Sequence, residues 1–423
     1  MLSTLRNAWR IPEIRKKIIF TLLMLLVFRL GSAIPVPYMN KDIIRSIFEA
    51  SEGGLLQFLD LMGGGTFSNY SIFATSIYPY ITASIVIQLL TIAIPKLEEL
   101  AKEGEEGKKK ITMLTRYGAI ALALIQSIGY TFGLFSSALE TSNILQTSIV
   151  IISMVAGTAF LMWLGELITE KGIGNGISLI IFIGIISKLP SELISTFKLV
   201  SSGQLNIIKV LIFGIVFLII VAAVIAIQEG ERRIPVQYAK RVVGRKMYGG
   251  QSTHIPVKVL MAGVMPVIFA SSLLALPQTV ALFWEGGANW ITKYLTPSGS
   301  VGIWVYSIFN IVLIIFFTYF YTAIQFNTVE YAKNLQQNGG FIPGIRPGRP
   351  TSEHLNKVVN RVVIVGGLAL AVLSVLPIIL TKLFSMNVNF GGTAIIIVVG
   401  VALETVKQIE SQMLMRHYKG FLK

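Results

Sequence analysis

The chain contains ten apolar stretches that are each about long enough to cross a lipid bilayer as an α-helix. Hydrophobic residues make up 53% of the sequence and charged residues 13%, whereas soluble domains carry about 25% charged residues. The sequence therefore predicts an all-α integral membrane protein. We place the spans at about residues 18–34, 70–94, 117–137, 148–168, 176–190, 206–227, 257–283, 302–325, 358–380 and 391–406.

Lysine and arginine are concentrated in alternate connections between these spans. They gather in the N-terminus, in the connections after the second, sixth and eighth spans, and in the C-terminal tail. Because basic loops stay on the cytoplasmic side of a membrane, both termini are expected to be cytoplasmic. The net charge of +15 thus faces the cytosol, where lipid headgroups or an acidic partner could bind it.

The spans divide into two groups of five around the short segment 191–205. An odd number of spans in each half means that the second half enters the bilayer from the opposite side, which is the topology of an inverted repeat. The predicted domains are an N-terminal half, 1–190, and a C-terminal half, 206–423. The second half contains two long cytosolic loops, 228–256 and 326–357. Loops of this size are usually binding sites for a ligand or a partner.

The motifs of enzymes and nucleotide-driven transporters are missing from the sequence. The chain has no cysteine, and its three histidines lie apart from one another outside the spans. KGIGNGIS lacks the spacing of a phosphate-binding loop and opens an apolar span, so an interfacial turn is its better reading. The sequence predicts no catalytic residue, no metal site and no cofactor.

Two features of the apolar regions have both a structural and a functional reading. The segment 53–69 contains a short apolar stretch between glycine groups, which is either an interfacial helix or a mobile one that can enter a cavity. Several spans also carry small polar residues, which either hold helices together or mark a seam that can part. The spans are nearly free of charge, which weakens the alternative of an ion-coupled secondary carrier for a small solute.

Six stretches in order along the chain resemble the SecY family, the channel subunits of the bacterial protein translocase. They are YPYITASIVIQLL, AKEGEEGKKKITMLTRYG, KGIGNGIS, AKRVVGRKMYGGQSTHIPVKVLMAGVMP, GGFIPGIRPGRPT and GGTAIIIVVG. The resemblance implies ten helices in two inverted five-helix halves around a central hourglass pore, with a short plug helix. It also implies a passive pore for unfolded or nascent polypeptides that releases transmembrane segments sideways into lipid.

The resemblance assigns residues to each part of such a channel. A constriction ring of aliphatic side chains would seal the pore by excluding water without binding the polypeptide. The ring would consist of Ile77, Ile81, Ile177, Ile181, Ile268 and Ile397. The plug, residues 55–67, would include Leu55, Leu56, Phe58, Leu59, Leu61 and Met62. The lateral gate, between the second and seventh spans, would include Thr82, Gln88, Gln126, Ser271, Ser272 and Leu276.

The resemblance also implies partners and a location. Arg245 and Arg346 would contact a ribosome or a SecA-like ATPase motor on the cytosolic side. SecE-like and SecG-like small membrane subunits, signal sequences, unfolded polypeptides and membrane lipid complete the expected partners, and the bacterial plasma membrane is the expected location. A carrier for a small solute and a structural membrane scaffold are the alternatives.

Overall fold

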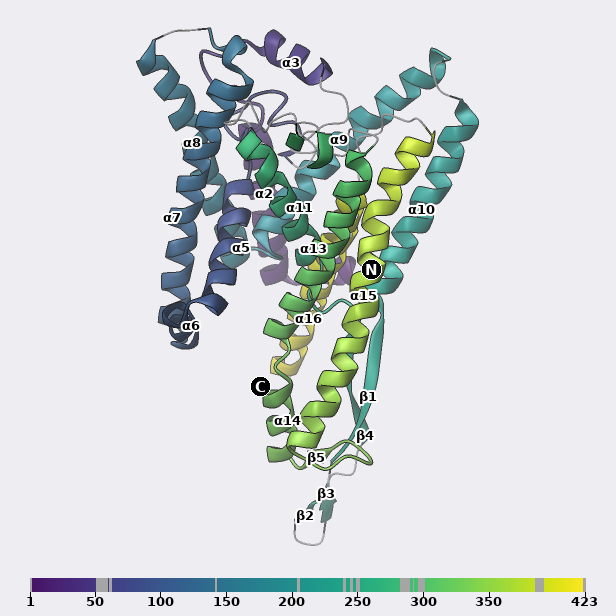
Figure 1. Ribbon diagram of the computed structural model, residues 1–423. Coiled ribbons are helices and arrows are strands. Elements are labelled where there is room, and N and C mark those ends of the chain that lie inside the picture. The colour runs from purple at the N-terminus through teal and green to yellow at the C-terminus, as the bar shows by residue number, and fades with distance from the viewer. Residues whose placement is uncertain are drawn as a thin grey trace.

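Long helices that run side by side form the body of the protein, and a small β-structure projects from one end (Figure 1). The computed structural model describes residues 2–50, 60, 63–140, 143–203, 206–238, 241–243, 246–248, 252–281, 290–291, 293–295, 301–384 and 392–420.

The first part of the chain, as far as Ser201, is helical apart from its connections. Its α-helices are α1 (Leu2–Arg10), α2 (Pro12–Gly31), α3 (Lys41–Ala50), α5 (Tyr78–Ala93), α6 (Pro95–Lys102), α7 (Glu105–Gly129), α8 (Ile144–Lys171) and α9 (Gly176–Ser201). A π-helix, η1 (Tyr130–Leu134), continues α7, and a short 3₁₀ turn, η2 (Ser136–Ala138), follows it.

The second part combines helices with short strands. The helices are α10 (Ile207–Glu229), α11 (Met265–Ala281), α13 (Gly302–Gln325), α14 (Thr328–Gln337), α15 (Arg349–Phe384) and α16 (Gly392–Gly420). The strands are β1 (Glu231–Tyr238), β2 (Arg241–Val243), β3 (Lys246–Tyr248), β4 (Ser252–Lys258) and β5 (Gly340–Phe341).

Seven helical stretches in the described ranges are long and apolar enough to cross a membrane, and the bent pair α5 and α6 makes an eighth. The other two predicted spans coincide with α2 and α11. Basic residues at both ends of α2 leave it a short apolar middle, and α11 is only 17 residues long. The protein is thus a multi-pass helical membrane protein, and the count of ten stays a prediction.

Several predicted spans have different bounds in the structure. The seventh was placed at 257–283, but residues 257 and 258 belong to β4 and α11 begins only at Met265. The second was placed at 70–94, but α5 begins only at Tyr78. Tyr70 and Ser76 have φ angles of +42° and +53°, which interrupt a right-handed helix. The Tyr70 carbonyl accepts a hydrogen bond from the Val36 N–H at 2.9 Å, outside any helix. The fifth was placed at 176–190, but α9 continues through Pro190 to Ser201. The loss of one N–H at a proline was therefore not enough to end this helix.

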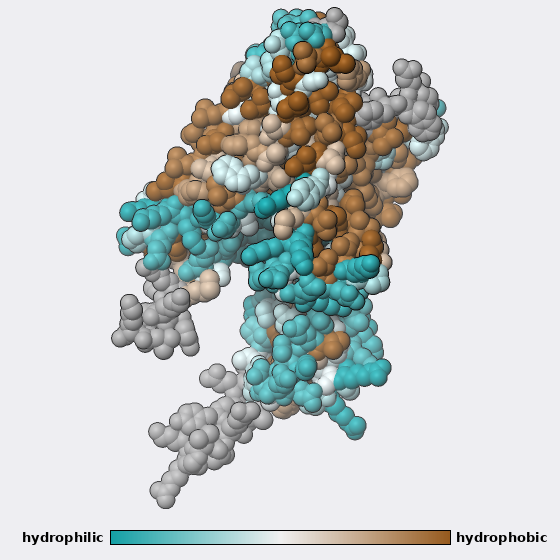
Figure 2. Space-filling view, turned by 90° about the vertical axis from the view of Figure 1, so that its left-hand side faces the viewer, coloured by the Kyte–Doolittle hydropathy of each residue, from teal (hydrophilic) through white to brown (hydrophobic). Residues whose placement is uncertain are grey.

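The surface separates into an apolar body and a hydrophilic projection (Figure 2). Only 11% of the most apolar window of α10 is buried within the protein, so this helix offers most of its surface to lipid. The projection contains β1, which pairs antiparallel with both β4 and β5. Its own small apolar core joins these strands to α14 and α15 through residues such as Val236, Leu335 and Leu355.

The two halves of the helical body meet around one large hydrophobic core. In the first half, α5 packs against α7 and α8, and in the second half α11 packs against α13. Contacts between α5 and α11, between α9 and α16 and between α2 and α16 join the halves. This arrangement brings side chains from four distant helices to the middle of the molecule.

Candidate pore and lateral gate

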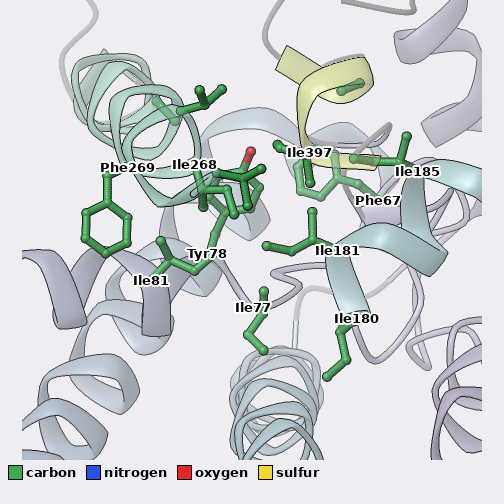
Figure 3. Packing of buried hydrophobic residues seen from close by; sticks show 14 of the residues in the cluster. Phe67, Ile77, Tyr78, Ile81, Ile180, Ile181, Ile185, Ile268, Phe269 and Ile397 are labelled. Atoms are coloured by element: carbon green, nitrogen blue, oxygen red, sulfur yellow. The ribbon is translucent and has the colours of Figure 1, made fainter. Parts of the chain in front are cut away.

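Five of the six isoleucines predicted to form a ring are buried together in the central core. Ile77, Ile81, Ile181, Ile268 and Ile397 are each at most 3% exposed. They come from the start of α5, from α9, from α11 and from α16. Figure 3 shows them gathered around the same point, whereas Ile180, the neighbour of Ile181 on α9, points away from it. Residues far apart in the sequence therefore build one aliphatic cluster.

The sixth isoleucine, Ile177, lies at the edge of this cluster. It is partly buried and packs against the core. A methyl group added to Gly165 would lie 3.2 Å from the Ile177 Cγ1 atom, so Ile177 also lines the contact between α8 and α9. Ile177 is thus less buried in the cluster than Ile181, which lies one helical turn further along α9.

Two aromatic residues join the isoleucine cluster. Tyr78, in the first turn of α5, is buried next to Ile268, and Phe67 lies close to Ile181 and Ile185 (Figure 3). Phe67 is the last residue of the predicted plug, and the plug itself stays a prediction. For Tyr78 the sequence offered only one signal, which is its place inside the YPYI motif.

Most of the predicted plug lies outside the described residues. This applies to Leu55, Leu56, Phe58, Leu59, Leu61 and Met62. The described end of the segment is held by Phe67, whose ring lies edge-on to Phe48, Tyr130 and Phe135 with centroid separations of 4.8 to 5.6 Å. Such aromatic pairs contribute about 0.5–1.5 kcal/mol each beyond their buried area, so the chain is firmly anchored here.

A hydrogen bond crosses the contact between the two halves. The Tyr321 hydroxyl on α13 donates to the Gln88 Oε1 atom on α5 at 2.6 Å, and the Gln88 amide donates to the Ser84 hydroxyl at 3.2 Å. The Tyr321 ring also packs edge-on against Phe269 of α11, with centroids 5.1 Å apart. We call this contact of α5 with α11 and α13 the seam. Gln88 was predicted to lie there, whereas Tyr321 was not.

The other predicted gate residues lie on α5, α7 and α11. Thr82, Gln126, Ser271 and Ser272 are buried, and Leu276 is partly buried. The Ser272 hydroxyl donates to the Ile268 carbonyl within α11. Among the described residues, the Gln126 Oε1 and Ser271 Oγ atoms are buried without a hydrogen-bond partner. Buried polar atoms of this kind can exchange to water or to a polar substrate at low cost if the helices part.

The cytosolic arginines predicted to bind partners differ in what the structure describes. Arg245 lies outside the described residues. Arg346 is exposed in the connection between β5 and α15, and its carbonyl accepts a hydrogen bond of 2.9 Å from the Thr351 hydroxyl. Gly344 and Gly348 on either side have φ angles of +81° and +98°, a conformation that other residues rarely adopt. Arg346 therefore lies exposed in a turn of fixed backbone conformation.

Within the described ranges, no three or more histidine, aspartate or glutamate side chains are grouped so that they could hold a metal ion. Some acidic and basic side chains of the helical body are paired with one another. Arg116 of α7, for example, binds both carboxylate oxygens of Glu166 on α8 at 2.6 and 2.9 Å. The described residues of the central cluster are aliphatic and aromatic.

The chain is similar to known proteins over most or all of its length. The SecY family model matches residues 71–406. The protein translocase subunit SecY of Halalkalibacterium halodurans is 47% identical over the full length of both chains, and that of Streptomyces galbus is 46% identical, again over both full lengths.

Solved structures share the fold at lower identity. A structure described as that of a protein-conducting channel is 19% identical, with a TM-score of 0.68, and the match covers 95% of this chain and 93% of that one. Sec61 in a canine ribosome-channel complex from the endoplasmic reticulum is 17% identical, with a TM-score of 0.63 and 96% of each chain covered. The match of the family model and the full-length relatives show that the chain belongs to the SecY family.

Proposed function

We propose that this chain is the channel subunit of a protein translocase, through which unfolded or nascent polypeptides cross the membrane. Its SecY-family membership makes it a channel component rather than an enzyme. The observation that carries the proposal is the meeting of Ile77, Ile81, Ile181, Ile268 and Ile397 from four helices in one buried cluster. This cluster, with Ile177 at its edge, is the constriction of the pore.

An aliphatic constriction suits a channel that must pass any sequence. Branched aliphatic side chains expel water when they close against each other, so the resting pore blocks ions. They form no hydrogen bonds with the passing chain, so they do not retain it. Residues 55–67 form the plug that covers this constriction from the outer side, and the aromatic contacts of Phe67 anchor the end of the plug.

The seam is the lateral gate of the channel. A signal sequence is an apolar helix, and it competes with α11 and α13 for the surface of α5. The polar contacts of the gate favour this exchange, because hydrogen bonds between membrane helices contribute only about 0.6 kcal/mol on average. Thr82, Gln88, Gln126, Ser271, Ser272 and Leu276 line or adjoin the opening. Transmembrane segments leave through it into lipid.

The energy for transport comes from partners, because the sequence lacks a nucleotide-binding motif. A SecA-like ATPase or a translating ribosome binds the cytosolic projection, where Arg245 and Arg346 contribute positive charge. SecE-like and SecG-like subunits bind the apolar outer surface of the bundle. The complex lies in the bacterial plasma membrane with both termini in the cytoplasm, as the distribution of basic residues favours.

The comparisons do not favour the alternative of a small-solute carrier, because the matched relatives are translocase subunits. Solute uptake into proteoliposomes without any motor would be the mark of a carrier. A purely structural scaffold would give neither solute uptake nor polypeptide export.

A reversible crosslink across the seam tests the proposed function. The chain contains no cysteine, so a Thr82→Cys, Leu276→Cys variant introduces a single possible bridge. Oxidation should block export of a secretory protein by vesicles that contain the complete translocase, and reduction should restore it. The matched control is Asn310→Cys, Ser374→Cys, because these two side chains are hydrogen-bonded at 2.9 Å within the second half. Export that continues through an oxidised 82–276 bridge would contradict the proposal.

A further inference from the structure

A group of charged and polar contacts joins Asp60 and residues 64–68, which are described parts of the predicted plug and of the chain just after it, to neighbouring helices. The Asp60 carboxylate accepts a hydrogen bond from the Lys188 ammonium group at 2.5 Å through one oxygen, and from the Ser68 backbone N–H at 2.7 Å through the other. The Asp60 carbonyl accepts a hydrogen bond from the Gly65 N–H at 2.9 Å. Through these bonds the turn at residues 63–68 is held to Asp60, and Lys188 ties this turn to α9.

A second cation holds the same turn from another helix. The Arg29 Nη1 atom on α2 donates to the Gly64 carbonyl at 3.0 Å and to the Ser187 hydroxyl on α9 at 2.9 Å. Gly64 has a φ of +70°, and a Cβ atom added to it would lie 2.7 Å from the Cα atom of Gly184. The turn therefore approaches the α9 backbone so closely that only glycine fits.

Because these charges are largely buried, the stability of the contact depends on their pairing. The Asp60 side chain is only 9% exposed and the Lys188 side chain 23%, so neither group is fully solvated while the turn is docked. A carboxylate that is largely buried without its cation is unfavourable, and an isolated ammonium group in the same place is too. The pair is therefore stable either intact or after both groups have moved into water. The contact therefore has two stable states, one with the ion pair formed and one with both groups in water.

The position of these contacts separates them from the seam. Arg29 and Lys188 lie on α2 and α9, which both belong to the first five predicted spans. The bond between Gln88 and Tyr321 instead joins α5 of that half to α13 of the other. The hydrogen bonds of Asp60, Lys188 and Arg29 described above all join residues of the first half, so parting the seam does not require them to break.

Helix α9 connects these contacts to the constriction. Ile181, Gly184 and Lys188 follow one another at spacings of three and four residues, which places them along one face of the helix. Ile181 lies in the central cluster, Gly184 lies against Gly64, and Lys188 holds Asp60. The face of α9 that forms part of the constriction also holds the end of the plug.

We propose that Asp60, Lys188 and Arg29 form a polar clasp that sets how readily the plug leaves the constriction, independently of the opening of the seam. The proposal rests on the proposed function, because it assigns the clasp a role in sealing that channel. Release of the plug requires the carboxylate and the two cations to separate into water. A signal sequence that parts the seam alone leaves the clasp closed and the ion barrier in place.

The experiment measures the resting ion conductance of the complete translocase in a planar bilayer and, in vesicles, the export of a reporter with a weak signal sequence. Lys188→Gln should raise the open fraction of the resting channel about tenfold, the order of effect expected when a half-buried ion pair loses one charge. Tyr321→Phe should leave the resting conductance unchanged and should increase export of the weak-signal reporter. Lys198→Gln, an exposed site on the same helix, is the matched control and should resemble the parent chain.

A variant with exchanged charges is the control for an effect of the substitutions on folding. Asp60→Asn should raise the conductance as Lys188→Gln does, and the combined variant Asp60→Lys, Lys188→Asp should recover at least part of the seal. A resting conductance of Lys188→Gln equal to that of the parent chain would overturn the clasp. So would a conductance in Tyr321→Phe as high as in Lys188→Gln. Export of a strong-signal protein by the parent complex, measured in parallel, fails only if the proposed function itself is wrong.

Discussion

The hydrogen bond across the seam gives a quantitative prediction. Tyr321→Phe removes the hydroxyl that donates to Gln88 at 2.6 Å and keeps the ring that packs against Phe269. Hydrogen bonds between membrane helices contribute about 0.6 kcal/mol on average and at most about 1.7 kcal/mol. Because this bond is short and leaves the Gln88 oxygen without its donor, we expect about 1 to 1.7 kcal/mol. The open fraction of the gate should therefore rise about 5- to 20-fold.

The assay is export of a reporter whose signal sequence has a shortened apolar core. Such a signal competes poorly for the closed seam, so Tyr321→Phe should increase its export, whereas a reporter with a strong signal should change little. Tyr319→Phe is the matched control, because the Tyr319 hydroxyl bonds to the Asn360 carbonyl of α15 within the same half. The reasoning is refuted if Tyr321→Phe exports the weak-signal reporter no better than the parent chain, or if Tyr319→Phe improves export equally.

Three further predictions concern the constriction, the cytosolic turn and the plug segment. Ile81→Asn places an amide in the aliphatic cluster, so water should enter and poorly hydrophobic signals should pass; unchanged signal stringency in a secretion assay would count against it. Arg346→Glu should abolish motor-driven export and change the free energy of unfolding by less than about 0.5 kcal/mol, because this side chain is exposed; motor binding and thermal unfolding measure the two effects. Gly64→Ala should destabilise the turn by about 1–3 kcal/mol, because Gly64 has a positive φ, and should raise the resting conductance. A resting conductance equal to that of the parent chain would contradict this prediction.

Much of the helical body could be predicted from local sequence. Apolar stretches of suitable length mark α8, α10 and α15 because lipid requires a continuous apolar surface and internally satisfied backbone groups. The isoleucine cluster could not follow from those stretches alone, since Ile180 and Ile181 are both buried and only one of them joins the group (Figure 3). The family resemblance names Ile181 and leaves out Ile180, whereas hydrophobicity alone treats the two residues alike.

The errors in helix bounds have local causes. Residues 70–77 are apolar enough to extend the second span, but the positive φ angles of Tyr70 and Ser76 turn the chain toward residues 34–36. A tyrosine and a serine do not by themselves predict a positive φ angle, because here it depends on tertiary hydrogen bonds. Pro190 looked like the end of the fifth span, yet the helix tolerates the loss of one N–H and continues.

The polar clasp could not be predicted because its partners are distant in sequence. Asp60 and Lys188 are 128 residues apart, and Arg29 and Gly64 are 35 residues apart. The sequence gives each of them an isolated signal, such as an arginine near the end of an apolar span. A tertiary structure is needed to place a carboxylate and two cations around one turn.

The passage of a polypeptide through the isoleucine cluster is the central claim, and crosslinking to a stalled chain tests it most directly. A secretory protein with a single cysteine would be stalled during export in translocases that carry Ile181→Cys, Ile397→Cys or, as the control, Ile180→Cys. The absence of native cysteine makes each bridge unambiguous. The account predicts disulfides at 181 and 397 and none at 180, since Ile180 points away from the cluster. Failure to crosslink at 181 and 397, or equal crosslinking at 180, would contradict it.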